Sequence, residues 1–179
     1  QLHLALGVNR HGQVSVAARL ADDGALDFVL GSLHILPEIG DLYFQTYHSI
    51  SQCDCYFDVY LSELQRVAEL DFYDVLAHVG YARRYMCRDG TDGAMTLEKF
   101  GEKVEFLLRT VIDKGRGLEI NCSGIRDGCG PFPGEEILRL YRSMGGEIIT
   151  VGSDAHVPER VGMHLQDAYA LLRECGFLY

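Results

Sequence analysis

Three of the seven histidines follow short apolar runs of the kind that form β-strands. They are His34 in GSLH, His78 in LAHVG and His156 in SDAH, where Asp154 lies two positions earlier. Alternate residues on a strand share a face, so Asp154 and His156 can approach the same point. Neutral imidazole and carboxylate groups are usual ligands of divalent zinc, manganese and iron. A single histidine at a strand end is usually a hydrogen-bonded polar residue, but three of them with an aspartate favour a metal site.

Arginines that follow the same apolar runs indicate a class of substrate. Arg83 and Arg84 come shortly after His78, and Arg126 follows NCSG after the next run. A guanidinium group matches two phosphate oxygens at once, so arginines beside a metal cluster favour a phosphoester substrate. The alternative for each arginine is a surface side chain in a weak ion pair.

The six cysteines do not have the spacing of a disulfide framework, and we expect them to be reduced. Cys53 and Cys55 form a Cys-x-Cys pair without a second pair at zinc-site spacing, which argues against a structural zinc. His48 lies on a long polar and aromatic segment, where we expect a solvated side chain.

The elements that must position these residues are apolar runs alternating with amphipathic segments, the pattern of parallel strands linked by crossover helices. Strands are expected at 2–8, 26–35, 72–80, 117–123 and 147–154, and helices at 14–20, 58–70, 97–114, 134–144 and 163–175. The carboxyl ends of parallel strands converge on one mouth. Five such units are too few for a closed eight-stranded barrel, so the pattern predicts an open sheet or part of an incomplete barrel.

The segment 36–57 is predicted to be a long loop after a strand, in a position that often covers a binding site. Its aromatic residues could enclose the organic part of a small ester, although we expect at least half of them to pack in the core. They are Tyr43, Phe44, Tyr47 and Tyr56.

Length and charge narrow the class of protein. The 179 residues fit one domain, and 47% hydrophobic with 23% charged residues is the balance of a globular chain. The formal net charge of -10 opposes binding to nucleic acid or anionic membranes. No stretch reaches the roughly 20 apolar residues that span a bilayer, and the first residues lack the features of a signal peptide. We therefore expect a cytoplasmic protein with no nucleic-acid or membrane partner, for which an oligomer is compatible with the sequence.

The segments DFVLGSLH, DVLAHVGYARRY, LEINCSGIR and ITVGSDAHVPERVG, in this order, resemble the polymerase and histidinol phosphatase (PHP) superfamily, most closely its histidinol-phosphatase branch. The resemblance runs from about residue 26 to the end of the chain. It implies an α/β fold, an incomplete distorted (β/α)7 TIM-like barrel of the PHP type. It also implies two or three divalent metal ions (zinc, manganese or iron) in a complete site at the barrel mouth.

The resemblance further implies a metal-dependent phosphoester hydrolase. The activity expected is that of a histidinol-phosphatase-like phosphomonoesterase of histidine biosynthesis, which uses a metal-activated water on a small phosphorylated substrate. The metal ligands would be His34, His78, Asp154 and His156. Of these, Asp154 and His156 would also be catalytic, while Arg126 and one of the two arginines after His78, taken as Arg83, would bind the phosphate.

The sequence departs from the family pattern at its start. Family members open with a His-x-His motif that has no counterpart here, and the best match to their metal-bridging Gly-x-Glu is Gly7-Val8-Asn9, whose amide lacks the negative charge. We therefore expect residues 1–179 to form a single PHP-like domain, truncated at the N-terminus and slightly at the C-terminus. The alternatives are a truncated or degenerate domain that binds a metal, a phosphorylated ligand or a partner protein without catalysis, and a related hydrolase of amides, lactones or phosphodiesters.

Overall fold

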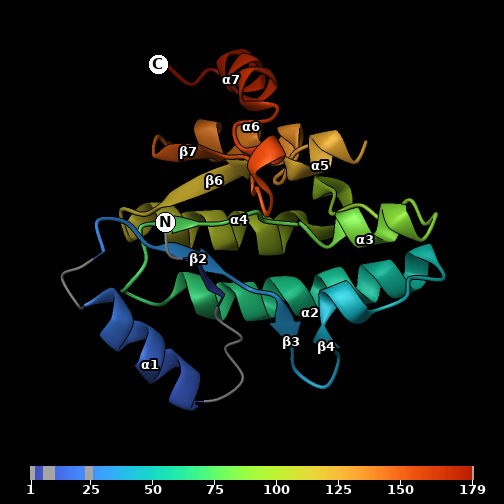
Figure 1. Ribbon diagram of the computed structural model, residues 1–179, viewed down its shortest axis with the longest axis horizontal. Coiled ribbons are helices and arrows are strands. Elements are labelled where there is room, and N and C mark those ends of the chain that lie inside the picture. The colour runs from blue at the N-terminus through green and yellow to red at the C-terminus, as the bar shows by residue number, and fades with distance from the viewer. Residues whose placement is uncertain (1–2, 6–10, 23–25, 179) are drawn as a thin grey trace.

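A computed structural model of the chain describes residues 3–5, 11–22 and 26–178. Five strands form one sheet in which each strand is parallel to its neighbours. In sheet order they are β1 (His3–Ala5), β2 (Leu30–Ser32), β5 (Val75–Leu76), β6 (Gly117–Asn121) and β7 (Ile149–Gly152). Sheet order follows chain order, so every connection leads to the adjacent strand and all the carboxyl ends lie along one edge (Figure 1).

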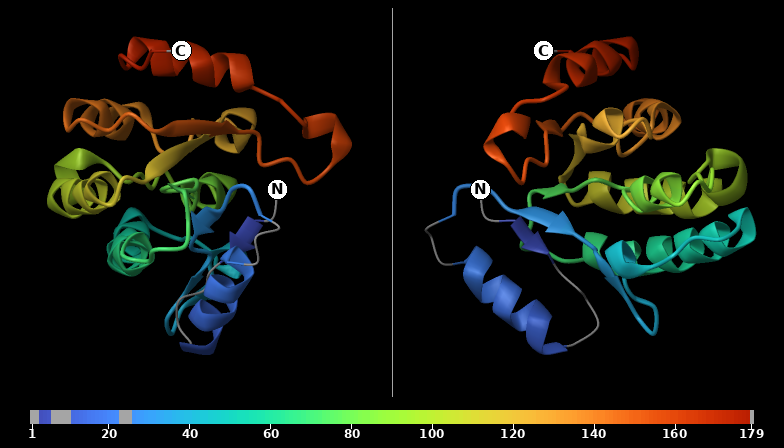
Figure 2. Two further views of the ribbon diagram at one scale, coloured as in Figure 1. Left: turned by 90° about the vertical axis from the view of Figure 1, so that its left-hand side faces the viewer. Right: turned by 45° about the vertical axis from the view of Figure 1, so that its right-hand side comes forward.

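Helices connect successive strands and a final helix follows the last strand, as the alternating sequence pattern predicts. They are α1 (His11–Ala21), α2 (Ile50–Ala68), α3 (Arg83–Arg88), α4 (Leu97–Asp113), α5 (Ser123–Arg126), α6 (Glu135–Ser143) and α7 (Leu165–Glu174). Helices α2, α4 and α6 lie side by side along one face of the sheet (Figures 1 and 2), where α4 packs against both of the others. Among the described residues, none of the helices combines the length and apolar character needed to cross a membrane.

The core lies between this helical layer and the sheet. Helix α4 buries Phe100, Val104, Leu107, Leu108 and Val111, which recur at helical spacing along one stripe. All five residues of β6 are buried, as expected of a central strand in a parallel sheet. The polar side chains of β6 are therefore buried and shielded from solvent.

The prediction of a loop over 36–57 is wrong in its second half. Helix α2 begins at Ile50, eight residues before the predicted start, because the Ser49 side chain caps it by accepting a hydrogen bond from the Gln52 backbone N–H at 3.2 Å. Cys53 and Phe57 lie on its buried face. The rest of the segment forms the antiparallel pair β3 (Ile35–Leu36) and β4 (Gly40–Asp41), followed by the short 3-10 helix η1 (Leu42–Phe44).

The remaining differences concern short elements. The predicted strand at 26–35 is reduced to β2, and that at 72–80 to the two residues of β5. Helices α3 and α5 were not predicted, because helices of 6 and 4 residues are too short to show an apolar repeat. The predicted strand at 2–8 includes β1. Its residues 6–8 lie outside the described residues, and so does Asn9. All six cysteines are free thiols.

Candidate metal centre

The sheet brings the sequence-predicted side chains to its carboxyl edge. His34 follows β2 by two residues, His78 follows β5 by two residues, and Asp154 and His156 follow β7. Strands β2 and β5 are hydrogen-bonded neighbours, and β6 lies between β5 and β7. Residues far apart in sequence therefore meet here because the strands are parallel.

The two strand-end histidines face one another. Nε2 of His34 lies 3.1 Å from Nε2 of His78, and the rings stack with centroids 5.0 Å apart. Two imidazole nitrogens that bind one tetrahedral zinc ion at about 2.0–2.1 Å lie roughly 3.3 Å apart, so this separation is close to that of a shared ligand pair. The Tyr81 ring contacts both histidines, and its hydroxyl donates to the His34 carbonyl at 3.2 Å.

His78 is held in the form that binds metal. Its side chain is buried, and burial followed by the nearby His34 lowers its pKa to about 3, so the imidazole is neutral at physiological pH. Its buried Nδ1 atom has no hydrogen-bond partner among the described residues. A neutral, buried imidazole with an unsatisfied nitrogen, next to a second imidazole, fits a soft or borderline divalent cation.

Asp154 and His156 form a second pair at the end of β7. The Asp154 side chain is 18% exposed, and its Oδ2 accepts hydrogen bonds from Arg84 Nη2 at 3.2 Å and Ser123 Oγ at 3.4 Å. The His156 side chain is 79% exposed, with Nδ1 lying 3.0 Å from the Asp154 carbonyl oxygen and 3.8 Å from its carboxylate. His156 therefore lies beside Asp154 and faces solvent.

The backbone is unusual at both pairs. His78 has φ 34° and Asp154 has φ 48°, in the left-handed region that residues other than glycine seldom adopt. Such conformations cluster at functional sites, where the surrounding structure maintains them. The geometry stops short of a complete cluster, since the part of the chain that the structure describes contains no group of three or more His, Cys, Asp or Glu arranged to hold a metal ion.

Of the two arginines after His78, the structure brings Arg84 to this edge. Arg84 Nη2 donates to Asp154 and to the Ser123 hydroxyl, and its Nε lies 3.5 Å from Asp127. Arg83, the residue taken from the sequence as the phosphate ligand, instead pairs with Asp92 at 3.2 Å. Arg126 pairs with its sequence neighbour Asp127 at 2.9 Å.

Glu119 is a member of this region that the sequence reasoning missed. It is 3% exposed on β6, and its Oε2 accepts hydrogen bonds from the His78 backbone N–H at 3.1 Å and from Asn121 Nδ2 at 3.2 Å. Burial raises its pKa above the ordinary value. Gly152 on β7 leaves room for the carboxylate, because a Cβ at this position would overlap Glu119 Oε1. The signal that could have found it is an acid that alternates with Asn121 and Ser123 in an otherwise apolar strand.

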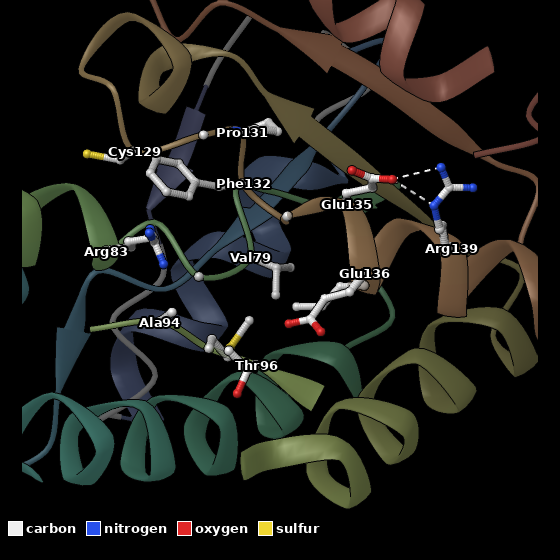
Figure 3. Close-up of a pocket in the computed structure, with 15 residues that line it drawn as sticks. Val79, Arg83, Ala94, Thr96, Cys129, Pro131, Phe132, Glu135, Glu136 and Arg139 are labelled. Atoms are coloured by element: carbon white, nitrogen blue, oxygen red, sulfur yellow. Dashed lines mark hydrogen bonds and ion pairs between the residues drawn. The ribbon is translucent and has the colours of Figure 1, made fainter. Parts of the chain in front are cut away.

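Two hollows flank the edge of the sheet. One, of about 570 Å³, is lined by Glu119, Gly152 and Asp154 together with apolar Leu30. The other, of about 490 Å³, is lined by Arg83, Phe132 and the ion pair between Arg139 and Glu135 (Figure 3). Of these two hollows, only the first is lined by one of the sequence-predicted metal ligands, Asp154.

Of the four aromatic residues considered in the segment 36–57, only some are exposed near the carboxyl edge of the sheet. Tyr43 and Phe44 are 55% and 77% exposed, whereas Tyr47 is buried and donates its hydroxyl hydrogen to the Leu42 carbonyl at 3.0 Å. Tyr56 packs against Tyr47. The expectation that half of these rings serve the core is confirmed.

The fold is that of solved histidinol-phosphatase structures. The histidinol phosphate phosphatase of Lactococcus lactis, crystallised with zinc, L-histidinol and phosphate, aligns with a TM-score of 0.77 and 23% identity over 94% of this chain and 64% of that one. In sequence, the chain is 27% identical over 158 residues to the probable histidinol-phosphatase of Clostridium acetobutylicum and 29% identical over 168 residues to the histidinol-phosphatase of Lactococcus lactis. No family model matches the chain.

These alignments cover most of this chain but only part of its relatives. Each includes 87% of the chain, against 60% of the Clostridium protein and 58% of the Lactococcus protein. The chain therefore spans less than two thirds of the length of either relative.

Proposed function

We propose that the protein is a metal-dependent phosphomonoesterase of the histidinol-phosphatase type. The observation that carries this proposal is the approach of His34 to His78 on adjacent strands, with Asp154 and Arg84 at the same edge of the sheet. The names of the sequence relatives support it, as does the Lactococcus structure, which was solved with zinc, L-histidinol and phosphate. The proposed substrate is a small phosphate monoester.

In this proposal His34, His78, Asp154 and His156 hold the metal. Bound divalent ions would supply an activated water nucleophile and stabilise charge on the phosphoryl oxygens. Arg84 supplies the guanidinium that binds the phosphoryl group, and its contact with Asp154 places cationic and anionic groups side by side before substrate arrives. Arg126, whose side chain is 19% exposed, is the second candidate for phosphate.

We also propose that the open sheet is an arc of a distorted (β/α)7 barrel and that residues 1–179 form one PHP-like domain. The consecutive strand order supports this architecture, because each βα unit adds its strand beside the previous one. The hollow lined by Glu119 and Asp154 would then lie on the inner side of this arc.

A second candidate function is binding of a metal or phosphorylated ligand without turnover. Two observations favour it. His156 is 79% exposed beside Asp154, and the described ranges contain no group of three metal-ligating side chains. A site with too few ligands would hold a cation weakly and would not activate water.

Two measurements separate these functions. The first is the metal content of the protein purified without chelators, by elemental mass spectrometry. The second is hydrolysis of histidinol phosphate, other monoesters and a phosphodiester. At least one bound zinc, manganese or iron per chain with monoester hydrolysis supports the phosphatase. Bound metal or ligand without hydrolysis supports the binding function, and cleavage of the diester alone would contradict both.

A further inference from the structure

Cys87 and Cys129 come together beside Arg84 although they lie on different connections of the sheet. Cys87 is on α3, and Cys129 follows α5 by three residues. Both cysteines line one hollow of about 300 Å³ with Tyr43, Arg84 and Asp127, and the Cys129 thiol donates a hydrogen bond to the Asp127 carbonyl at 3.4 Å. Cys87 is partly exposed, whereas Cys129 is 7% exposed. In Figure 3 the Cys129 sulfur points away from Phe132.

We propose that Cys87 and Cys129 are a redox modification site that closes to a disulfide when the protein meets a peroxide. Cys87 is the residue that reacts with peroxide because it is the more exposed of the two. Cys129 is the resolving residue because it is buried beside the same hollow, and burial also raises its pKa, which makes it the less reactive thiol toward peroxide.

The reaction balances with hydrogen peroxide as the oxidant. The Cys87 thiol releases its proton, the thiolate attacks one peroxide oxygen and the O–O bond breaks, which gives a sulfenic acid and a hydroxide that takes up the released proton to form one water. The Cys129 sulfur then attacks the Cys87 sulfur, the S–O bond breaks, and the hydroxyl leaves as a second water. Two thiols and one peroxide thus give one disulfide and two waters, with two electrons passing to the peroxide.

The disulfide would fix the surroundings of Arg84. Helix α3 carries both Arg84 and Cys87, and Asp127 lies two residues before Cys129. Arg84 already pairs with Asp127 at 3.5 Å and with Asp154 at 3.2 Å. Linking the two segments would restrict movement of this arginine. The disulfide itself does not depend on the proposed phosphatase activity.

The test is peptide mapping of the full chain after brief treatment with hydrogen peroxide and alkylation of the remaining thiols. Trypsin cuts after Arg84, Arg88, Arg126 and Arg139 and isolates the two cysteines in peptides 85–88 and 127–139. The expected result is a linked pair whose mass is two hydrogens below the sum of the peptides. The link should disappear with dithiothreitol and in Cys87→Ser.

Cys55 provides the matched control, because it is an exposed thiol outside this pair. Cys55→Ser should leave the linked peptides unchanged. The proposal is overturned if both peptides remain alkylated after oxidation, or if either cysteine links mainly to another. As a second measure, peroxide should raise the thermal midpoint of the wild type and leave that of Cys87→Ser unchanged.

Discussion

The Nε2 atoms of His34 and His78 lie 3.1 Å apart although 44 residues separate them in sequence. The contact exists because β2 and β5 pair in parallel, with Leu30 opposite Val75, and each strand is followed closely by its histidine. The pairing and register of these two strands therefore bring the two rings together. Local sequence around either histidine would not produce the pair.

We expect His78→Asn to weaken binding of zinc or manganese by more than about tenfold, because it removes a buried nitrogen that we propose as a metal ligand. Metal affinity is measured by titration with a competing chelator, and circular dichroism checks the fold. His48→Asn is the control, since His48 is exposed on the segment before α2. Equal affinity in the two variants would contradict the ligand role.

Arg84→Lys should lower kcat/KM for a phosphate monoester by about tenfold to a hundredfold, the range expected for losing charge-assisted hydrogen bonds. Arg83→Lys is the matched variant one residue away, and it should change kcat/KM by less than about threefold. The same order should hold for the affinity of inorganic phosphate. A larger effect at Arg83 would support the sequence-based choice of Arg83 as the phosphate ligand and contradict the proposal for Arg84.

The helices that the sequence predicted well are those with long apolar stripes. Helix α4 was predicted at 97–114 and spans Leu97–Asp113, because its buried residues repeat at helical spacing over several turns. The candidate site was harder to predict. Adjacent helical residues point about 100° apart, so the choice between Arg83 and Arg84 depended on a six-residue helix too short to detect.

Glu119 shows a different reason for incomplete prediction. The sequence pattern located the ends of the strands, so polar residues at those ends could be identified. His34 and His78 were chosen in this way. Glu119 lies inside a strand whose residues are all buried, where polarity is visible in sequence but its hydrogen-bond partners are not. One partner, Asn121, is on the same strand, but the other, the His78 N–H, belongs to the neighbouring connection, so only the assembled sheet identifies it.

Glu119→Ala should destabilise the protein by about 2–4 kcal/mol, because the His78 N–H and the Asn121 amide would lose a buried acceptor and a cavity would form. Glu119→Gln should stay within about 1 kcal/mol of the wild type, since its amide oxygen can accept the same hydrogen bonds. Urea unfolding at neutral pH measures both. Equal destabilisation by the two substitutions would indicate that negative charge, and not hydrogen bonding, is required.

Asp89 gives a pH-dependent prediction. The Arg88 guanidinium, followed by the Tyr47 backbone N–H, lowers its pKa from 3.8 to about 2 in the folded protein. The folded state therefore binds fewer protons than the unfolded state in this window. The carboxylate contributes stability that is complete above pH 3.8 and is lost as the pH falls toward 2.

Asp89→Asn should thus lower stability by about 1 kcal/mol at neutral pH and flatten the dependence of the thermal midpoint on pH between 4 and 2. Asp92→Asn is the control, because that side chain is 86% exposed in its ion pair with Arg83. Parallel curves for Asp89→Asn and the wild type across the acid range would contradict the assignment.

The left-handed backbone at His78 and Asp154 has an evolutionary consequence. Holding a residue other than glycine in such a conformation costs about 1–3 kcal/mol, and glycine would remove that cost at either position. At His78 the loss of a buried imidazole that packs against His34 and Tyr81 would offset this gain, whereas the Asp154 side chain is partly exposed. Laboratory evolution for thermostability without an activity screen should therefore erode this site first at Asp154.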